Sequence, residues 1–161
     1  MSPRMEWSFF PVYLASCTAA AMTGAWFAPD GWYRALAKPR WTPPDWVFPV
    51  VWTTVYILIA LAAARVAGKP GSAFALALWA VQMPLNALWS PVFFGLHRIG
   101  QGLGVIVALW AVVAWCLVAL WQVDWLAGLL FVPYLVWLTI AAALNFAIWR
   151  ANPGERMAAT G

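Results

Sequence analysis

The stretch "GQGLGVIVALWAVVAWCLVALWQ", residues 100–122, contains no Asp, Glu, Lys or Arg. An α-helix needs about 20 apolar residues, at about 1.5 Å per residue, to cross the roughly 30 Å hydrocarbon core of a bilayer. This stretch is long enough to do so. Because backbone groups in lipid must form hydrogen bonds within their own segment, we expect the stretch to be a membrane-spanning helix.

The whole chain resembles this stretch in composition. Of its 161 residues, 65% are hydrophobic and only 9% are charged. A soluble domain has about 25% charged residues, so this chain could not cover a water-facing surface. A β-barrel is disfavoured because barrel strands alternate apolar and polar residues in short blocks. The apolar runs here are long and unbroken, so we expect an all-α membrane protein.

Four more apolar segments flank the first one on both sides. We expect a single domain over 1–161, a five-helix transmembrane bundle in which a long first loop, 28–45, acts as a lid. The expected helices are at about 6–27, 46–67, 72–96, 100–122 and 125–149. The Leu-Ala-Ser-Cys at 14–17 resembles a lipoprotein cleavage site, but the apolar run continues to about Phe27 and carries Glu6 and Pro11. We therefore expect this segment to remain a membrane helix.

The basic residues predict the orientation of the chain. The formal charge of +4 comes from residues at segment ends, which is typical of membrane edges and does not indicate nucleic-acid binding. Arg4, Arg65 and Lys69 fall on one side of the membrane. The larger group falls on the other side: Arg34, Lys38, Arg40, Arg98, Arg150 and Arg156. An excess of Lys and Arg marks the cytoplasmic side, so we expect the long loop and the C-terminus there.

Amides and tryptophans collect in the membrane half next to the long loop. They form two helix faces with spacings of three or four residues: Trp79, Gln82, Asn86 and Trp89, and Trp137, Ala141, Asn145 and Trp149. Unpaired amides in hydrocarbon are costly, so Gln82, Asn86 and Asn145 should face the bundle interior. Apolar walls with a few polar anchors are typical of a cavity for a flat apolar ligand. Alternatively, the amides join helices and the tryptophans form an interfacial belt.

The long loop and the start of the next segment are rich in proline. Prolines restrict the backbone and disfavour helix before them, and they occur at positions 39, 43, 44 and 49. We expect a stiff, extended lid that lays Trp41 and Trp46 across the mouth of the cavity. The alternative is an anchor at the membrane interface.

The residue types that carry most catalytic chemistry are missing from the apolar segments. The single histidine, His97, lies in a turn, and the sequence shows no Ser-His-Asp set, carboxylate pair or glycine-rich phosphate loop. Cys17 and Cys116 have the character of small buried hydrophobes. We expect no metal site and no required cofactor. The lack of charged residues in the interior of these segments argues against a pump, an ion-coupled transporter or a hydrolase.

Three blocks of the sequence resemble the translocator protein family, also called tryptophan-rich sensory proteins or peripheral benzodiazepine receptors. The blocks are "WYRALAKPRWTPPDWVFPVVWTTVY" (32–56), "LNALWSPVFFG" (85–95) and "FVPYLVWLTIAAALNFAIWR" (131–150). The resemblance covers essentially the whole chain. It implies a five-helix bundle, commonly a homodimer, with a cavity under the first loop. The absence of a transit peptide and the heavy use of Ala and Trp favour a bacterial member in an envelope membrane.

The resemblance also implies ligands. The family binds porphyrins such as protoporphyrin IX, and isoquinoline carboxamide and benzodiazepine drugs, and some members bind cholesterol or related membrane lipids. By position, the implied ligand-binding residues are Trp41, Trp46, Trp52, Asn86, Trp89, Phe93, Trp137, Ala141, Leu144 and Asn145. We expect a receptor or carrier with a regulatory or transport role in tetrapyrrole metabolism. The alternatives are a light-dependent porphyrin-degrading enzyme that uses Trp52, and a scaffold without a ligand of its own.

Two positions depart from the family pattern. The sterol-recognition pattern near the C-terminus requires a tyrosine where this chain has Phe146, which puts high-affinity cholesterol binding in doubt. At the start of the fourth expected helix, Gln101 stands where the animal proteins carry a tryptophan. This second difference implies a lower affinity for the drugs.

Overall fold

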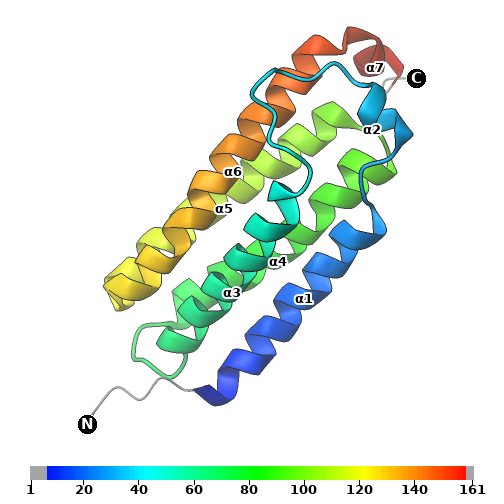
Figure 1. The fold of residues 1–161 in the computed structure, drawn as a ribbon. Helices are drawn as coiled ribbons and strands as arrows, with labels where there is room; N and C mark the ends of the chain where they lie inside the picture. Colours follow the sequence, from blue (N-terminus) through cyan, green and yellow to red (C-terminus); the bar gives the residue numbers. More distant parts are fainter. Residues whose placement is uncertain (1–6, 159–161) are drawn as a thin grey trace.

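The computed structural model describes residues 7–158, with the side chains of residues 7–155, and this part of the chain is helical and contains no strand. The prediction of an all-α fold is confirmed. The long helices, which lie side by side in Figure 1, are α1 (Phe10–Trp26), α3 (Val47–Val66), α4 (Ala73–Ser90), α5 (Ile99–Val123) and α6 (Trp125–Ala151). The short elements are η1 (Trp7–Phe9), α2 (Gly31–Ala35), η2 (Pro91–Gly95) and α7 (Pro153–Ala158).

Four helical segments of the described chain are long and apolar enough to cross a membrane, so the chain is a membrane protein. These segments are Val47–Val66, Ala73–Gly95, Ile99–Val123 and Trp125–Ala151. Helix α1 has only 17 residues and is not among them. The expected first helix reached residue 6, which together with Arg4 lies outside the described residues. The side chain of Arg156 also lies outside them.

The third expected helix is not one continuous α-helix. Helix α4 ends at Ser90, and η2 is a π-helical turn in which the N–H of Leu96 donates to the carbonyl of Pro91 at 2.8 Å. Pro91 has no N–H for the carbonyl of Ala87 four residues earlier. The hydroxyl of Thr23 donates to that carbonyl instead, at 3.1 Å. The proline therefore changes the helix geometry. It also leaves the carbonyl of Ala87 free to accept the bond that connects α1 to α4.

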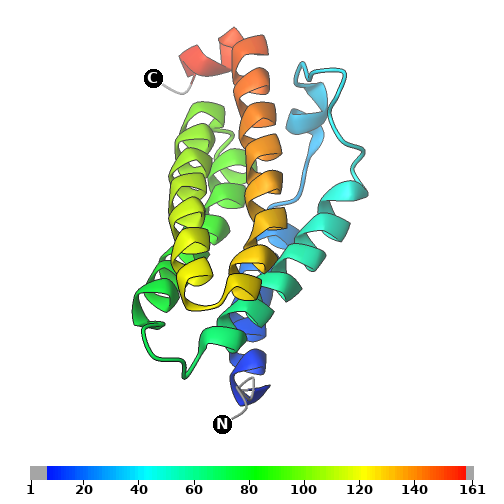
Figure 2. The ribbon, with the colours of Figure 1, turned by 90° about the vertical axis from the view of Figure 1, so that its left-hand side faces the viewer.

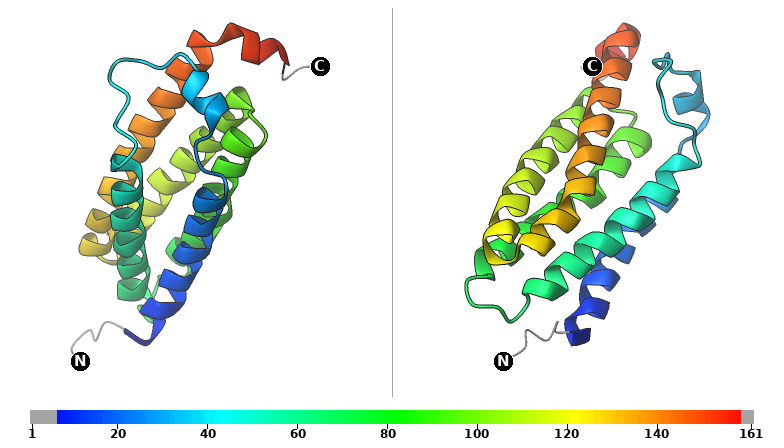
Figure 3. Two further views of the ribbon diagram at one scale, coloured as in Figure 1. Left: turned by 45° about the vertical axis from the view of Figure 1, so that its right-hand side comes forward. Right: turned by 60° about the vertical axis from the view of Figure 1, so that its left-hand side comes forward.

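The long helices share one core, in which alanines pack among larger side chains such as Phe131 and Tyr134. Helix α6 packs against α5 and α3, α4 packs against α5, and α1 packs against α3 and α4. Ala60, Ala62 and Ala63 of α3 are fully buried in this core, which lets α3 approach its neighbours closely. One end of the bundle holds α2, α7 and the 28–46 segment, and the other holds the start of α1 (Figures 2 and 3).

The first loop contains a short helix that the sequence did not predict, α2, formed by Gly31–Ala35. Asp30 begins this helix, because its carboxylate accepts a hydrogen bond from the N–H of Tyr33 at 3.0 Å. No proline interrupts the chain between Pro29 and Pro39, so nothing opposes helix there. The proline-rich part, 39–46, contains no regular helix, which fits the restriction that prolines impose.

The first part of the 28–46 segment is fixed to the end of α6 and to α7. Asn152 both accepts from the N–H of Ala37 and donates to its carbonyl, at 3.0 Å each. The indole N–H of Trp32 donates to Glu155 at 3.0 Å, and the His97 ring stacks on Trp32 at 4.2 Å. These contacts hold α2 in place over the bundle.

Candidate ligand cavity

A cavity of about 480 Å³ lies below α2 and is lined by residues of all five long helices. This volume is within the range of about 300–1,000 Å³ that is usual for small-molecule sites. One wall comes from the C-terminal half of α1 and the residues after it, and carries only small side chains and a proline: Ala20, Ala21, Gly24, Ala25, Ala28 and Pro29. Because these side chains are short, the wall leaves space between α1 and α3.

The opposite walls are aromatic. Phe48, Trp52 and Tyr56 come from α3, and Trp89 and Phe94 come from α4 and η2. The Trp52 ring stacks on the Tyr56 ring with centroids 5.5 Å apart and planes inclined by 28°. Ile106, Leu109 and Leu138 complete the lining from α5 and α6. The arrangement is an apolar slot with flat rings on one side.

A chain of buried hydrogen bonds begins at the cavity wall. The Tyr56 hydroxyl donates to Asn86 Oδ1 at 2.8 Å, and Asn86 Nδ2 donates to the Tyr134 hydroxyl at 2.7 Å. The Tyr134 hydroxyl donates in turn to Gln82 Oε1 at 2.8 Å. These bonds join α3, α4 and α6, so the buried amides connect helices, as one of the two interpretations of the sequence proposed. Asn86 also lines the cavity, so this residue both joins helices and forms part of the cavity wall.

A second amide connects three helices beside the first. Asn145 of α6 accepts from the indole N–H of Trp89 at 3.1 Å and donates to the carbonyl of Ile99 at 2.9 Å. Asn145 is 2% exposed, and Gln82 and Asn86 are 0% and 7% exposed, so all three amides face the interior as expected. The Asn145 bonds fix the orientation of the Trp89 ring, which lines the cavity.

The structure brings only some of the expected ligand-binding residues to the cavity. Trp52, Asn86 and Trp89 line it. Phe93, Trp137, Leu144 and Asn145 are buried but do not line it, and Ala141 is partly buried and does not line it either. Trp137 lies just behind the wall, with its ring 5.4 Å from Phe48 and 6.5 Å from Trp52. Ligand binding by these residues stays a prediction.

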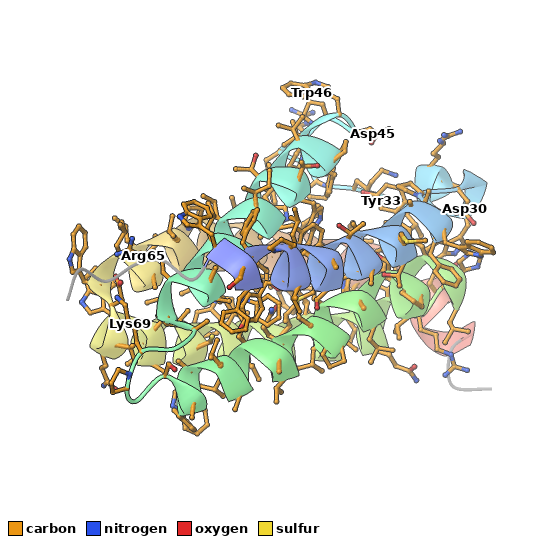
Figure 4. The ribbon with its side chains drawn as sticks, turned by 90° about the horizontal axis from the view of Figure 1, so that it is seen from below. Asp30, Tyr33, Asp45, Trp46, Arg65 and Lys69 are labelled. Atoms are coloured by element: carbon orange, nitrogen blue, oxygen red, sulfur yellow. The ribbon has the colours of Figure 1, made fainter. Side chains whose placement is uncertain are left out.

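Trp41 and Trp46 do not roof the cavity in this structure. Their side chains are 51% and 67% exposed, and Figure 4 shows Trp46 directed away from the bundle. Tyr33 and Arg34 of α2 line the cavity at this end instead, together with Asp45. The reason is the helix that begins at Asp30, which carries these two side chains over the bundle.

Several lining residues were missed by the sequence reasoning. The small-residue wall had a signal, since Ala20, Gly24 and Ala28 recur every four residues and therefore share one helix face. Tyr56 could have been placed beside Trp52 by the same rule. No pattern in the sequence indicated that Arg34 and Asp45 would line the cavity, because their positions depend on the unexpected helix α2.

The charged groups of this end lie around α2. The pKa of Asp30 is lowered by the hydrogen bond from the N–H of Tyr33 and by the neighbouring His97, whose Nε2 is 3.1 Å from the carboxylate. Burial raises the pKa of the Tyr33 phenol, and the negative charge of Asp45 raises it further. Among the described side chains, no three His, Cys, Asp or Glu residues lie close enough together to hold a metal ion.

A profile of the TspO/MBR family matches residues 10–150. The chain belongs to this family. Among the relatives of this TspO/MBR protein, Protein CrtK of Rhodobacter capsulatus is 51% identical over 156 residues, which cover 94% of this chain and 98% of the relative. The tryptophan-rich sensory protein of Cereibacter sphaeroides is 51% identical over 149 residues, covering 92% and 94%. The translocator protein of Homo sapiens is 37% identical over 130 residues, covering 78% and 77%.

Proposed function

We propose that this TspO/MBR protein binds porphyrins such as protoporphyrin IX, and other flat apolar molecules of the isoquinoline and benzodiazepine type, in the cavity under α2. Its role would be that of a receptor or carrier in tetrapyrrole metabolism. The observation that carries the proposal is the slot of about 480 Å³ with aromatic walls. Rings such as Trp52 and Trp89 offer faces on which a planar guest can stack.

The free polar groups of the cavity support a guest that is mostly apolar. The hydroxyls of Thr53 and Ser90 and the indole N–H of Trp52 form no hydrogen bond to the described residues, and all three residues line the cavity. Asn86 is already satisfied by Tyr56 and Tyr134. A guest would therefore find a few hydrogen-bonding groups on a largely apolar surface, which is usual for ligand sites.

Equilibrium binding of protoporphyrin IX to the detergent-solubilised protein tests this proposal. We expect saturable binding, and stabilisation of the fold by about 2.7 kcal/mol at a hundredfold excess over Kd. Trp52→Leu should weaken binding about tenfold, because it removes a stacking surface from the cavity wall. Trp115→Leu is the matched control, since Trp115 is 60% exposed on α5 and does not line the cavity. Equal affinities of the two variants would contradict the proposed site.

A second candidate function is light-dependent degradation of a bound porphyrin. The observation in its favour is the position of Trp52, which lines the cavity and stacks on Tyr56. An excited porphyrin in contact with this indole could oxidise it. Under fixed illumination, the wild-type protein should then give a product that Trp52→Phe gives far more slowly, with free porphyrin as the blank. The same product at the same rate from both proteins would remove this candidate.

We also propose that α1 is a fifth membrane span and that the 28–46 segment faces the cytoplasm. Helix α1 is apolar, and η1 extends it by a further turn. Arg34, Lys38 and Arg40 lie in the 28–46 segment, which fits the cytoplasmic side. In intact cells, a membrane-impermeant maleimide should label Pro70→Cys and spare Arg40→Cys. The reverse pattern would contradict the orientation, and the buried Cys17 and Cys116 should give little background.

A further inference from the structure

Among the residues that the structure describes, Arg34 and Asp45 are the only charged ones that line the cavity. Arg34 lies in the last turn of α2, and Asp45 lies shortly before the start of α3. Both side chains are exposed, whereas most of the apolar and aromatic lining comes from the long helices below them. The formal charge of the cavity is therefore concentrated at its exposed end.

Neither of these charges is paired within the described residues. The ion pairs found there join Arg65 and Lys69 to Asp124, and His97 to Asp30. Lys38, a neighbouring cation, donates to the backbone carbonyls of Tyr33, Arg34 and Leu36 and lies over the Tyr33 ring. Its ammonium group is thus already engaged. Arg34 keeps a guanidinium group at the cavity that no carboxylate of the described chain neutralises.

An unpaired guanidinium group at the rim of an apolar slot favours a particular shape of guest. A guanidinium group can bind a carboxylate through two parallel N–H···O bonds, which gives orientation as well as attraction. The apolar body of such a guest would occupy the aromatic slot, and its carboxylate would stay at the water-facing rim. Asp45 would repel a second anionic group that came close to it.

We propose that Arg34 selects guests that carry a carboxylate at one end of a flat apolar body, and that Asp45 weakens the binding of the same guests. This inference rests on the proposed function and goes beyond it, because it assigns the charge of the guest and the residues that sense this charge. Substitutions at the two positions must then have effects of opposite sign. Such a pair of effects cannot come from a general loss of folding.

The test compares protoporphyrin IX, which has two carboxylates, with its dimethyl ester, which has the same ring and no charge. Arg34→Gln should weaken binding of the acid about fivefold and leave the ester unchanged. Asp45→Asn should tighten binding of the acid by up to about fivefold, again without an effect on the ester. The effect of Arg34→Gln on the acid should shrink as salt is added, because the rim is exposed to solvent.

Arg40→Gln is the matched control. It removes the same charge from the same 28–46 segment, but Arg40 does not line the cavity. We expect its affinity for the acid to stay within about twofold of the wild type, because Arg40 is exposed and makes no contact with a guest in the cavity, so that salt screens its charge. An equal loss of affinity for the acid in Arg34→Gln and Arg40→Gln would overturn the inference. The net positive charge of this end of the protein would then account for both losses, with no specific role for Arg34.

The failure of the inference and the failure of the proposed function look different in this experiment. If the acid and the ester bind saturably but Arg34→Gln changes neither affinity, the inference is overturned and porphyrin binding stands. If neither compound binds saturably to the wild-type protein, the proposed function is wrong, and the inference that rests on it is wrong as well. A loss of ester binding in Arg34→Gln would also overturn the inference, because the substitution would then have altered the cavity itself.

Discussion

At the scale of single residues, Tyr134 connects the buried polar groups of the bundle. Its side chain is 0% exposed, and its hydroxyl accepts from Asn86 and donates to Gln82. Neither bond can be replaced by water from outside without a rearrangement, because the surroundings are packed with apolar side chains. A buried polar group that loses its partner keeps the cost of its desolvation.

Tyr134→Phe should therefore destabilise the protein while keeping the aromatic ring. We expect a loss of about 1–2 kcal/mol, because two hydrogen bonds are removed and interhelical bonds in membranes contribute about 0.6 kcal/mol each on average. The measurement is the free energy of unfolding in mixed micelles. Tyr13→Phe is the control, since the Tyr13 ring packs on Trp79 at 4.9 Å but its hydroxyl forms no hydrogen bond to the described residues. Equal changes in the two variants would contradict this account.

The sequence predicted the buried amides of this network but not their partners. The cost of an unpaired amide in hydrocarbon was enough to place Gln82, Asn86 and Asn145 in the interior. Their partners could not be predicted, because Tyr56, Tyr134 and the carbonyl of Ile99 come from other helices. The rotation of a helix about its own axis decides which side chains meet. Because these helices are apolar on nearly all sides, the sequence does not indicate which face of each helix points inward.

At the scale of helices, α5 and α6 form a tight antiparallel pair whose close approach depends on Gly128. A side chain at this position would meet the backbone Cα of Trp121 at 2.9 Å and its Cβ at 2.8 Å. Those atoms cannot move aside without shifting α5. The glycine is thus required by the separation of the two helices near their connecting turn.

Gly128→Ala should cost about 1–3 kcal/mol of unfolding free energy through overpacking. Gly104→Ala is the matched control, because Gly104 also lies within a long helix but a Cβ there would meet nothing within 4 Å. That change should be neutral or stabilise the protein by up to about 1 kcal/mol, as alanine has the higher helix propensity. The contrast can be measured with the same mixed-micelle unfolding assay. A tolerated Gly128→Ala would show that the helix pair can separate easily.

Long charge-free runs predict helices of this kind well, because lipid requires internal hydrogen bonding. The short elements were not predicted. Helix α2 depends on one capping carboxylate, Asp30, in a segment that was expected to be a loop. The π-helical turn η2 depends on the acceptor that Pro91 leaves and on a hydroxyl from another helix, Thr23. Both short elements depend on contacts between a few atoms, and such contacts cannot be predicted from composition or periodicity.

At the scale of the whole molecule, the end of the bundle opposite the cavity is held by one carboxylate. Asp124 begins α6 by accepting from the N–H groups of Leu126 and Ala127, and it pairs with Arg65 at 2.8 Å and with Lys69. Figure 4 shows Arg65 and Lys69 together at the end away from Asp45. One buried side chain thus ties α3, the α3–α4 turn and α6 together.

This arrangement predicts how the stability depends on pH. Burial alone would raise the pKa of Asp124, but hydrogen bonds from Lys69, Arg65 and the N–H of Ala127 lower it to about 2. Since the pKa in the folded protein is below the unfolded value of 3.8, the charged group contributes about 2 kcal/mol above roughly pH 4. This contribution is lost as the pH falls through about 2.

Asp124→Asn should therefore lower the unfolding free energy by about 2 kcal/mol at pH 7, and the difference from the wild type should shrink towards pH 2. Asparagine can still cap the helix, so the change isolates the charge. Asp45→Asn, at an exposed carboxylate with no ion pair among the described residues, should leave the unfolding free energy nearly unchanged at both pH values. A difference at pH 7 that persisted unaltered at pH 2 would contradict the assignment.

The alanine-rich side of α1 has a consequence for how guests exchange. Alanine, glycine and proline have no side-chain rotamers to lose, so this surface is as ordered when empty as when occupied. If the cavity binds guests as proposed, guests of different shape would meet this surface without any reordering of its side chains. Under the proposed function, discrimination between guests, and the time each one stays, would then arise from the rings of α3 and α4 that face this surface and from the charges of Arg34 and Asp45 at the rim.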